Sequence, residues 1–447
     1  MPARRTPLTA SDNGSLHVLY VAWGFIPHRG PGAYRPLATV NELAKRGYRV
    51  TVLTADLDTF DLTIGGDRTL LAEVDPRVRV LRVPMLQDAL DPMINRWPQE
   101  RAANQRAWVR RLAVDQVQAF PEVVYSPWGP RARAVANALH REDPVDLTIA
   151  TGNPYVDFTV ALALNAEHGV PFVLDDRDSW ILNVYTGDEG NHADRVRPWL
   201  EYALDATAEM WFVNPPLANW HREAFPQCAE KIRVVENGWD PRFLTPADLP
   251  ARPANPDRLT FSFVGTINSG LPLRLLAEAW REARRRSPIL ASSELRFVGH
   301  FGHAGVMTAE QSRLRAEFTK HQVLFTGRQP KHALAQTYAE ADVLVFAKEG
   351  SRLVTSGKVY EYVATGRPIV SMIEKDHDAR RVLDGYPRWH DAAEHTVDAM
   401  ADAMVLAAAD ALNGAGQRDA ALAHGASHRR DAVLARALDQ LEQKLAL

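Results

Sequence analysis

One stretch of the chain, residues 341–370, limits most strongly the folds that the sequence can adopt. It begins with an apolar run rich in β-branched residues, at 341–347, which predicts a buried strand. After a polar loop, Ser356 is a suitable N-cap for a short helix over 357–364, which Gly366 ends. A second apolar strand follows at once. Because parallel strands need a crossover connection, this order predicts a βαβ unit of a parallel sheet.

The start of the short helix has the composition of a phosphate site. A helix N-terminus presents unpaired N–H groups and the positive end of the helix dipole. Lys358 would add a cation there, and Glu361, one turn further, could accept two hydrogen bonds from the hydroxyls of a ribose. A phosphate held beside such a carboxylate predicts recognition of a nucleotide. An ordinary solvated βαβ connection would explain the same residues.

The stretch from Ser356 to Pro368 resembles the donor site of the retaining glycosyltransferases of family 4, in the bacterial branch whose motif reads Ser-x-Lys-x-Tyr-Glu-Tyr-x-Ala-x-Gly-x-Pro. These enzymes have the GT-B fold, an α/β architecture of two doubly wound Rossmann-like domains that face a cleft. The resemblance implies that the helix start holds the diphosphate of a nucleoside-diphosphate sugar of the UDP or GDP type. It also implies that Glu361 binds the ribose of this donor.

The segment 258–425 is expected to form the nucleotide-sugar-binding domain. The apolar run at 259–265 precedes a polar loop and a helical pattern, which is again a strand, loop and helix of the phosphate-binding kind. Arg274 would lie on the first turn of that helix, and the resemblance places the nucleobase near Gly327. The predicted donor-binding residues are Gly265, Thr266, Asn268, Gly327, Arg328, Ser356, Gly357, Lys358 and Glu361.

Residues 15–245 are expected to form an N-terminal, acceptor-binding domain. An apolar strand at 16–22 leads into a glycine-rich loop and then a helix, which is how a doubly wound domain begins. The glycines of the loop do not match G-x-G-x-x-G, so the sequence does not predict an NAD site. Their placement resembles the N-terminal loop of GT-B enzymes, which lies between the acceptor and the donor phosphates.

A cluster of charges ends the predicted strand at 171–175. Asp176, Arg177 and Asp178 follow that strand directly, which predicts either a binding site or a self-satisfied Asp–Arg network. Arg35 is expected on the first turn of a helix, facing the cleft, although a solvated residue at a helix start is the alternative. The predicted acceptor-binding residues are Gly30, Gly32, Arg35, Asn153, Tyr155, Arg177, Asp178 and Trp180.

The reaction that the resemblance implies is transfer with retained anomeric configuration. The enzyme must stabilise a diphosphate leaving group while an oxocarbenium-like sugar forms. The predicted catalytic residues are Asp178, Lys358 and Arg274. Asp176 and Asp178 could hold a divalent ion, but they belong to the first domain, away from the expected diphosphate. We therefore predict no metal, and no cofactor besides the sugar nucleotide as co-substrate.

The sequence departs from the family pattern at three places. The position eight residues before Glu361, where the family has a second glutamate, is Leu353. The Arg and Lys that many members carry after the glycine equivalent to Gly265 are missing, and Thr151 and Gly152 replace a common histidine. Three other functions therefore stay open: a nucleotide-sugar epimerase, a pseudo-glycosyltransferase, and a non-catalytic nucleotide-sugar-binding partner.

The length of 447 residues predicts more than one domain. Residues 1–14 are expected to be a disordered tail, 246–257 a proline-rich linker, and 426–447 a terminal helix that packs back on the N-terminal domain. The single cysteine, Cys228, excludes a disulfide framework and favours a cytoplasmic location. A net charge of −3 gives no reason to expect nucleic acid as a partner.

Residues 85–135 hold three tryptophans, Trp97, Trp108 and Trp128, among many arginines. A helical pair packed on the sheet would carry them, and so would a surface that faces an acceptor or associates weakly with a membrane. The near-neutral charge and the lack of an apolar run long enough for a membrane span favour a small soluble metabolite or a glycan intermediate as acceptor.

Overall fold

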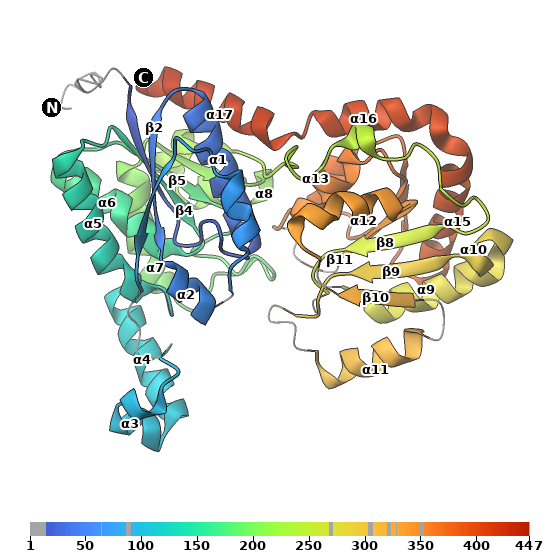
Figure 1. The fold of residues 1–447 in the computed structure, drawn as a ribbon, viewed down its shortest axis with the longest axis horizontal. Coiled ribbons are helices and arrows are strands. Elements are labelled where there is room, and N and C mark those ends of the chain that lie inside the picture. Colours follow the sequence, from blue (N-terminus) through green and yellow to red (C-terminus); the bar gives the residue numbers. More distant parts are fainter. Residues whose placement is uncertain are drawn as a thin grey trace. The chain divides into compact units, whose positions relative to one another are not determined.

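The computed structural model describes residues 15–446 apart from eight short gaps, at Ile64, 86–90, 268–270, 303–306, 320–322, Arg328, Glu349 and 351–352. The predicted tail at 1–14 and the predicted donor-binding residues Asn268 and Arg328 lie outside the described residues. The described residues divide into two compact units (Figure 1). Among the described residues, the first unit draws on the chain up to Asn183, on Asp188–Glu236 and on the chain from Leu434 onward, and the second on Val184–Gly187 and Asn237–Val433.

In the first unit the described strands form one parallel sheet of seven, in the order β3-β2-β1-β4-β5-β6-β7. The three central strands are buried along their whole length, as expected for a sheet that helices cover on both faces. The strands are β1 (His17–Val21), β2 (Arg49–Ala55), β3 (Arg79–Val83), β4 (Leu147–Gly152), β5 (Phe172–Asp176), β6 (Glu209–Phe212) and β7 (Ile232–Val234).

The helices of the first unit alternate with these strands. Two of them show the local signals of their ends: Gly169 takes a left-handed conformation (φ 72°) after α6, and Asn214 accepts the N–H of Leu217 to cap α8. The helices are α1 (Tyr34–Lys45), α2 (Leu57–Leu62), α3 (Gln99–Ala103), α4 (Gln105–Ala119), α5 (Gly129–Glu142), α6 (Phe158–His168), α7 (Ala193–Ala206) and α8 (Pro215–Ala224).

In the second unit six described strands form another parallel sheet, in the order β10-β9-β8-β11-β12-β13. Its strands are β8 (Thr260–Val264), β9 (Glu294–Val298), β10 (Val323–Gly327), β11 (Val343–Lys348), β12 (Ile369–Ile373) and β13 (Trp389–Asp391). Its helices are α9 (Leu273–Arg286), α10 (Pro288–Ser292), α11 (Ala309–Phe318), α12 (Leu334–Glu340), α13 (Gly357–Ala364), α14 (Ala379–Leu383), α15 (Val397–Asn413) and α16 (Arg418–Ala426).

Helices cover both faces of this second sheet, and the strands alternate between two cores. Val345 and Ala347 of β11 belong to one hydrophobic cluster, with α9 and α15, whereas Leu344 and Phe346 belong to another, with α12, α13 and α14. Successive side chains of a strand point to opposite faces, so this division is what a doubly wound sheet requires. The predicted fold class, two doubly wound α/β halves, is confirmed.

Each strand order reverses direction at one place. In the first unit the reversal lies between β1 and β4, and in the second between β8 and β11. In open α/β sheets ligands bind at such a switch point, in the crevice beyond the carboxyl ends of the strands. The loops that follow β1 and β4, and those that follow β8 and β11, are therefore where each unit can hold a ligand.

The chain divides earlier than the predicted linker at 246–257. The units separate after Glu236, and Leu244 and Leu249 are buried in a core of the second unit, together with Trp239.

The short strand β13 was not predicted, because three half-buried residues give no periodic signal.

The last helix, α17 (Arg430–Leu445), belongs to the first unit from Leu434 onward. Arg46 on α1 donates to the Ala435 carbonyl (2.8 Å) and to Glu442 (3.0 Å), and Lys444 donates to the Ala208 carbonyl (3.0 Å).

Among the described helices none is long and apolar enough to cross a membrane.

Candidate functional site

The switch point of the second unit brings two glycine-rich or polar loops together. Gly265 follows β8, and Lys358 lies on the first turn of α13, which follows β11. A Cβ atom added to Gly265 would lie only 3.2 Å from Cε of Lys358, so the lysine side chain crosses directly over this glycine. The Ser356 hydroxyl accepts the N–H of Lys358 (3.3 Å) and caps the helix. A cation and a helix start therefore meet at this point.

The loop after β8 is held by backbone hydrogen bonds to the neighbouring strand exit. Gly265 donates to the Val298 carbonyl (2.9 Å), and Ile267 donates to the His300 carbonyl (2.9 Å). Gly299 has φ 153°, and a Cβ there would lie 1.8 Å from the Gly265 carbonyl oxygen. Only glycine lets the two loops approach this closely.

Tyr362 holds the end of β8 in place through a hydrogen bond. Its side chain is buried, and its hydroxyl accepts the N–H of Val264 (2.8 Å). We expect Tyr362→Phe to lower the free energy of unfolding by about 1–3 kcal/mol, because it leaves that buried N–H without a partner. Urea unfolding would measure the change, with Tyr202→Phe, at a half-exposed tyrosine, as control. Equal stabilities of the two variants would contradict this role of Tyr362.

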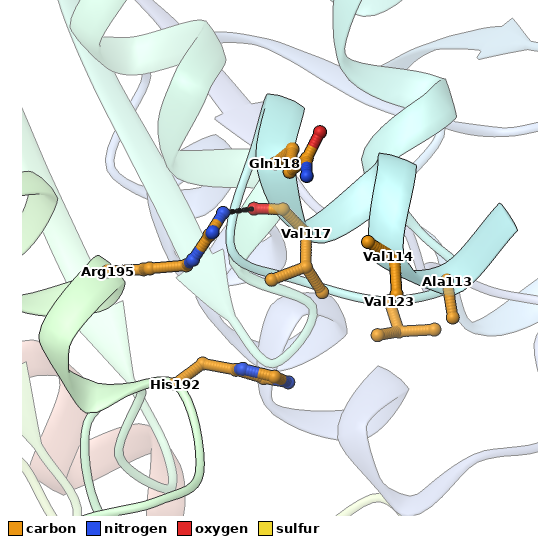
Figure 2. A pocket seen from close by; sticks show the side chains of 7 residues that line it. All are labelled: Ala113, Val114, Val117, Gln118, Val123, His192 and Arg195. Carbon is orange, nitrogen blue, oxygen red and sulfur yellow. Dashed lines mark hydrogen bonds between the residues drawn. The ribbon is translucent and has the colours of Figure 1, made fainter. Parts of the chain in front are cut away.

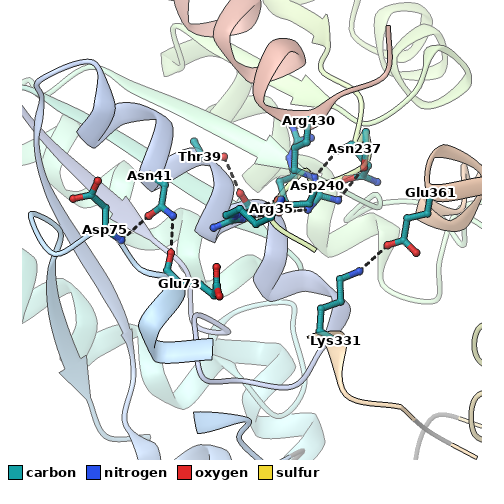
Figure 3. A network of polar contacts seen from close by, with 12 residues as sticks. Arg35, Thr39, Asn41, Glu73, Asp75, Asn237, Asp240, Lys331, Glu361 and Arg430 are labelled. Carbon is teal, nitrogen blue, oxygen red and sulfur yellow. Dashed lines mark hydrogen bonds and ion pairs between the residues drawn. The ribbon is translucent and has the colours of Figure 1, made fainter. Parts of the chain in front are cut away.

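Glu361 lies one turn into α13 and takes part in a small polar network, of which Figure 3 shows the ion pair with Lys331. Its Oε1 accepts from the ammonium of Lys331 (2.7 Å), and its Oε2 accepts from the hydroxyl of Tyr338 (2.5 Å). The side chains of Glu361 and Lys331 are 13% and 12% exposed, so the carboxylate is held firmly yet still reaches the surface. Each carboxylate oxygen has a second lone pair, with which it can accept a ligand hydroxyl.

The charge of Glu361 is fixed by its surroundings. Burial alone would raise the pKa of the Glu361 carboxyl, but the charges of Lys331 and Lys358 and the hydrogen bonds from Lys331 and Tyr338 lower that pKa to about 2. The group is therefore ionised at any physiological pH and can only accept hydrogen bonds. Vicinal hydroxyls, which donate, are the complementary ligand.

The structure brings together five predicted donor-binding residues, Gly265, Ser356, Gly357, Lys358 and Glu361, around the start of α13. Thr266 is partly exposed in the loop beside them. Arg274 is exposed on the first turn of α9 and makes no hydrogen bond or ion pair with a described residue, and Gly327 ends β10, two strands away from β8. Lys331 and Tyr338 were not predicted. Tyr338 fitted a helical core pattern, and Lys331 carried no local signal of its partner.

In the first unit Arg177 occupies the corresponding switch point. Its Nε donates to the hydroxyl of Thr151 (3.2 Å) and the carbonyl of Gly152 (3.0 Å), both at the end of β4. A Cβ on Gly32 would lie 2.3 Å from Nη1 of Arg177, so the guanidinium lies against the glycine-rich loop that follows β1. Nη2 of Arg177 donates to the carbonyl of Asn153 (2.5 Å). Three predicted acceptor-binding positions are thus adjacent: Gly32, Asn153 and Arg177.

Arg35 requires a correction. It lies on the first turn of α1 as predicted, but its side chain is 2% exposed and turned into the protein instead of toward a cleft or solvent. Its guanidinium donates to both carboxylate oxygens of buried Asp175 (2.7 and 2.8 Å) and to the Glu236 carbonyl (2.9 Å). The two charges therefore neutralise each other inside the first unit, and the role of Arg35 is structural.

Tyr155 and Trp180 also lie inside the first unit. Their rings stack at 5.3 Å with an angle of 9°, and the indole N–H of Trp180 donates to the Pro121 carbonyl (3.2 Å). Both side chains are buried, so aromatic packing is their visible role. Asp178 is partly exposed just beyond β5, and Gly30 lies against the ring of His28, whose Nδ1 accepts the Gly30 N–H (3.1 Å).

Burial raises the pKa of two carboxyl groups near β4 and β5. Burial, followed by the charge of Asp178, raises the pKa of Asp176 to about 8. Burial also raises the pKa of Glu122 to about 7, although both its oxygens accept N–H groups, from Tyr155 (2.8 Å) and Val156 (2.7 Å). Glu122 was not predicted, because its partners lie more than 30 residues away.

Asp176 makes stability depend on pH in a defined direction. A carboxyl whose pKa is higher in the folded protein than in the unfolded chain favours the fold while protonated, and this stabilisation is lost as pH rises through the folded value. Asp176→Asn keeps the neutral form at every pH. We therefore expect the variant to gain stability relative to the wild type between about pH 4 and pH 8. Urea unfolding at pH 5 and pH 8 measures this gain, and a pH-independent difference would contradict it.

Within the described ranges, no three or more His, Cys, Asp and Glu side chains gather in a way that could hold a metal ion. The Asp176 and Asp178 pair considered from the sequence is thus without a third such ligand among those residues.

Comparisons with known proteins agree with this geometry. Residues 258–410 match the family model described as glycosyl transferases group 1. Solved structures share the fold over almost the whole chain: a glycosyltransferase from Rickettsia africae (TM-score 0.65, 11% identity, 97% of this chain and 99% of that one) and sucrose-phosphate synthase from Thermosynechococcus elongatus (0.63, 16%, 96% and 99%). A third is HepE from Anabaena in complex with UDP and glucose (0.61, 12%, 96% and 100%). No curated protein matches the sequence.

At these identities the structural likeness shows the fold, which is GT-B. The family match lies in the second unit and includes both Gly265 and Glu361. Together they support a glycosyltransferase of the GT-B fold, as the sequence predicted. Membership of family 4 stays a prediction.

Proposed function

We propose that the protein is a retaining glycosyltransferase that moves a sugar from a nucleoside-diphosphate sugar to an acceptor, which is a small soluble metabolite or a glycan intermediate. The observation that carries the proposal is the ionised Glu361, held beside Lys358 and the start of α13 at the switch point of the second unit. This arrangement lies inside the segment that matches the glycosyltransferase family model.

The diphosphate and the ribose of the donor would each find a complementary group. The N–H groups at the start of α13 and the ammonium of Lys358 suit the diphosphate. The Glu361 carboxylate, oriented by Lys331 and Tyr338, suits the two hydroxyls of the ribose. Uridine is the first base to test, because HepE, a protein of the same fold, was crystallised with UDP.

The chemical task of these groups is to stabilise the departing diphosphate. Positive charge fixed in place before the reaction lowers the barrier for a leaving group on which negative charge grows. Lys358 and the dipole of α13 supply such charge, so we expect transfer to continue in the presence of EDTA. In the first unit we propose that Gly32, Asn153 and Arg177 contribute to acceptor binding, with Asp178 partly exposed beside them.

The stereochemistry of the product tests the proposal. The purified protein would be incubated with UDP- and GDP-sugars and a panel of acceptors, and NMR would give the anomeric configuration of the product. The proposal expects the configuration of the donor. A product of inverted configuration would contradict a retaining transferase, and tight donor binding without any turnover would favour a non-catalytic partner.

A second candidate is an epimerase that acts on a nucleotide sugar. The feature that favours it is the set of carboxyl groups at and just beyond the end of β5, Asp175, Asp176 and Asp178, of which Asp178 is partly exposed. An epimerase needs carboxyl groups of this kind as acid and base. Incubation with the nucleotide sugar alone separates the two functions, because an epimerase changes the sugar without an acceptor and a transferase leaves it unchanged or hydrolyses it slowly.

A further inference from the structure

A helical segment of the first unit, residues 91–119, extends past the helices that cover the sheet (Figure 1, α3 and α4). Its side chains are unusually apolar for a surface: Ile94 is 70% exposed, Val114 56% and Met93 47%. Four of the exposed large apolar side chains among the described residues lie in this segment, and Val123 and Val124 follow it closely. An apolar surface concentrated in one element marks an interaction site more often than scattered residues do.

The segment is preformed by its own packing. The guanidinium of Arg101 lies 3.7 Å from the ring centre of Trp97 and 5.3 Å from that of Trp108. Asn104 caps α4 by accepting the N–H of Ala107 (3.1 Å). The two tryptophans therefore hold α3 against α4, and the smaller apolar residues stay outside. Such a surface binds without first having to fold.

The segment that exposes these apolar residues also carries positive charge without an ion-pair partner among the described residues. Arg96, Arg106 and Arg110 are exposed, and none forms an ion pair with a described residue. Arg111 in contrast pairs with Glu100. The partner of the segment should therefore be anionic. A second copy of the same surface would bring like charges together, which is unfavourable.

A hollow lies beside α4, with an apolar floor and a cation at its side (Figure 2). It has a volume of about 290 Å³ and is lined by Val114, Val117 and Val123 among others. Arg195 of α7 closes one side and donates to the Val117 carbonyl (3.4 Å). An acyl chain with an anionic head group is complementary to both features, the apolar floor and the cation.

From these observations we propose that the segment 91–119 and the adjoining hollow dock on the surface of an anionic phospholipid bilayer. Ile94, Met93 and Val114 would enter the boundary between head groups and acyl chains, while the arginines contact lipid phosphates. The attachment is peripheral and reversible. It does not depend on the transfer reaction, and would hold for any activity of the protein.

Vesicle sedimentation tests the docking. We expect the protein to sediment with vesicles in which one lipid in three is phosphatidylglycerol, much less with pure phosphatidylcholine, and less at high salt. Arg106→Gln combined with Arg110→Gln should weaken binding by about fivefold for each arginine. Ile94→Asp combined with Val114→Asp should abolish it. Arg281→Gln and Leu406→Asp, at exposed positions of the second unit, are the matched controls and should bind as the wild type does.

Several outcomes would overturn the proposal. The protein would not sediment with phosphatidylglycerol vesicles, or it would bind both vesicle types equally, or both double variants would bind as well as the wild type. A wild type that is dimeric without lipid and becomes monomeric in the Ile94→Asp variant would assign the surface to a protein partner instead. Circular dichroism melting of each variant would show that loss of binding does not come from loss of folding.

Discussion

Replacement of Arg35 by methionine is expected to lower the free energy of unfolding of the first unit by about 3–5 kcal/mol. Asp175 is fully buried, and its carboxylate accepts two hydrogen bonds from the Arg35 guanidinium, through Nε (2.7 Å) and Nη2 (2.8 Å). Methionine fills a similar volume but leaves the carboxylate charged, buried and unpaired. Urea unfolding followed by circular dichroism would measure the change.

Two further variants show whether the effect belongs to the buried pair. Arg68→Met removes an ion pair with Asp61 in which both side chains are more than half exposed, and it should cost less than about 1 kcal/mol. Adding Asp175→Asn to Arg35→Met should recover part of the lost stability, because the unpaired charge is then removed. An Arg35→Met variant as stable as Arg68→Met would contradict the structural role of the pair.

Gly299→Ala is expected to destabilise the second unit by about 3 kcal/mol or more. The new Cβ would lie 1.8 Å from the Gly265 carbonyl oxygen, a backbone atom that cannot rotate away, and φ at this residue is 153°. The loop after β8 would have to move, so the variant should also lose the contact between Gly265 and Lys358.

Gly416→Ala is the matched control for this prediction. An added Cβ there meets no atom within 4 Å, and the change should alter stability by less than about 0.5 kcal/mol. Chemical unfolding of both variants gives the comparison. If Gly299→Ala were as stable as Gly416→Ala, the close approach of the two loops would not exist in solution.

Local signals in the sequence were enough to predict the organising element of the second unit. The apolar run before it, the Ser356 cap and Gly366 all lie within the single stretch 341–366, and the predicted helix 357–364 agrees with α13. The alternation of strands and helices was likewise enough for the fold class, because parallel strands need crossover helices. Element type and order are properties of short segments.

Contacts between residues that are distant in the sequence could not be predicted from local patterns. Arg35 and Asp175 are 140 residues apart, and nothing near Arg35 distinguishes a residue that faces a ligand from one that neutralises a buried carboxylate. Lys331 and Tyr338 reach Glu361 across 30 and 23 residues, so the sequence predicted the carboxylate without the groups that orient it. Tyr155 and Trp180 looked like ligand contacts but stack on each other.

Glu361 is the residue that the proposed donor site most requires, because it would bind the ribose of the nucleotide. The most direct test is the melting temperature of the protein with and without UDP, GDP and other nucleoside diphosphates, for the wild type, Glu361→Gln and the exposed control Glu310→Gln. A ligand at a hundred times its Kd stabilises the folded state by about 2.7 kcal/mol. We predict that one nucleotide raises the melting temperature of the wild type and of Glu310→Gln, and that Glu361→Gln loses this increase. An increase fully retained in Glu361→Gln, or no increase with any nucleotide, would contradict the account.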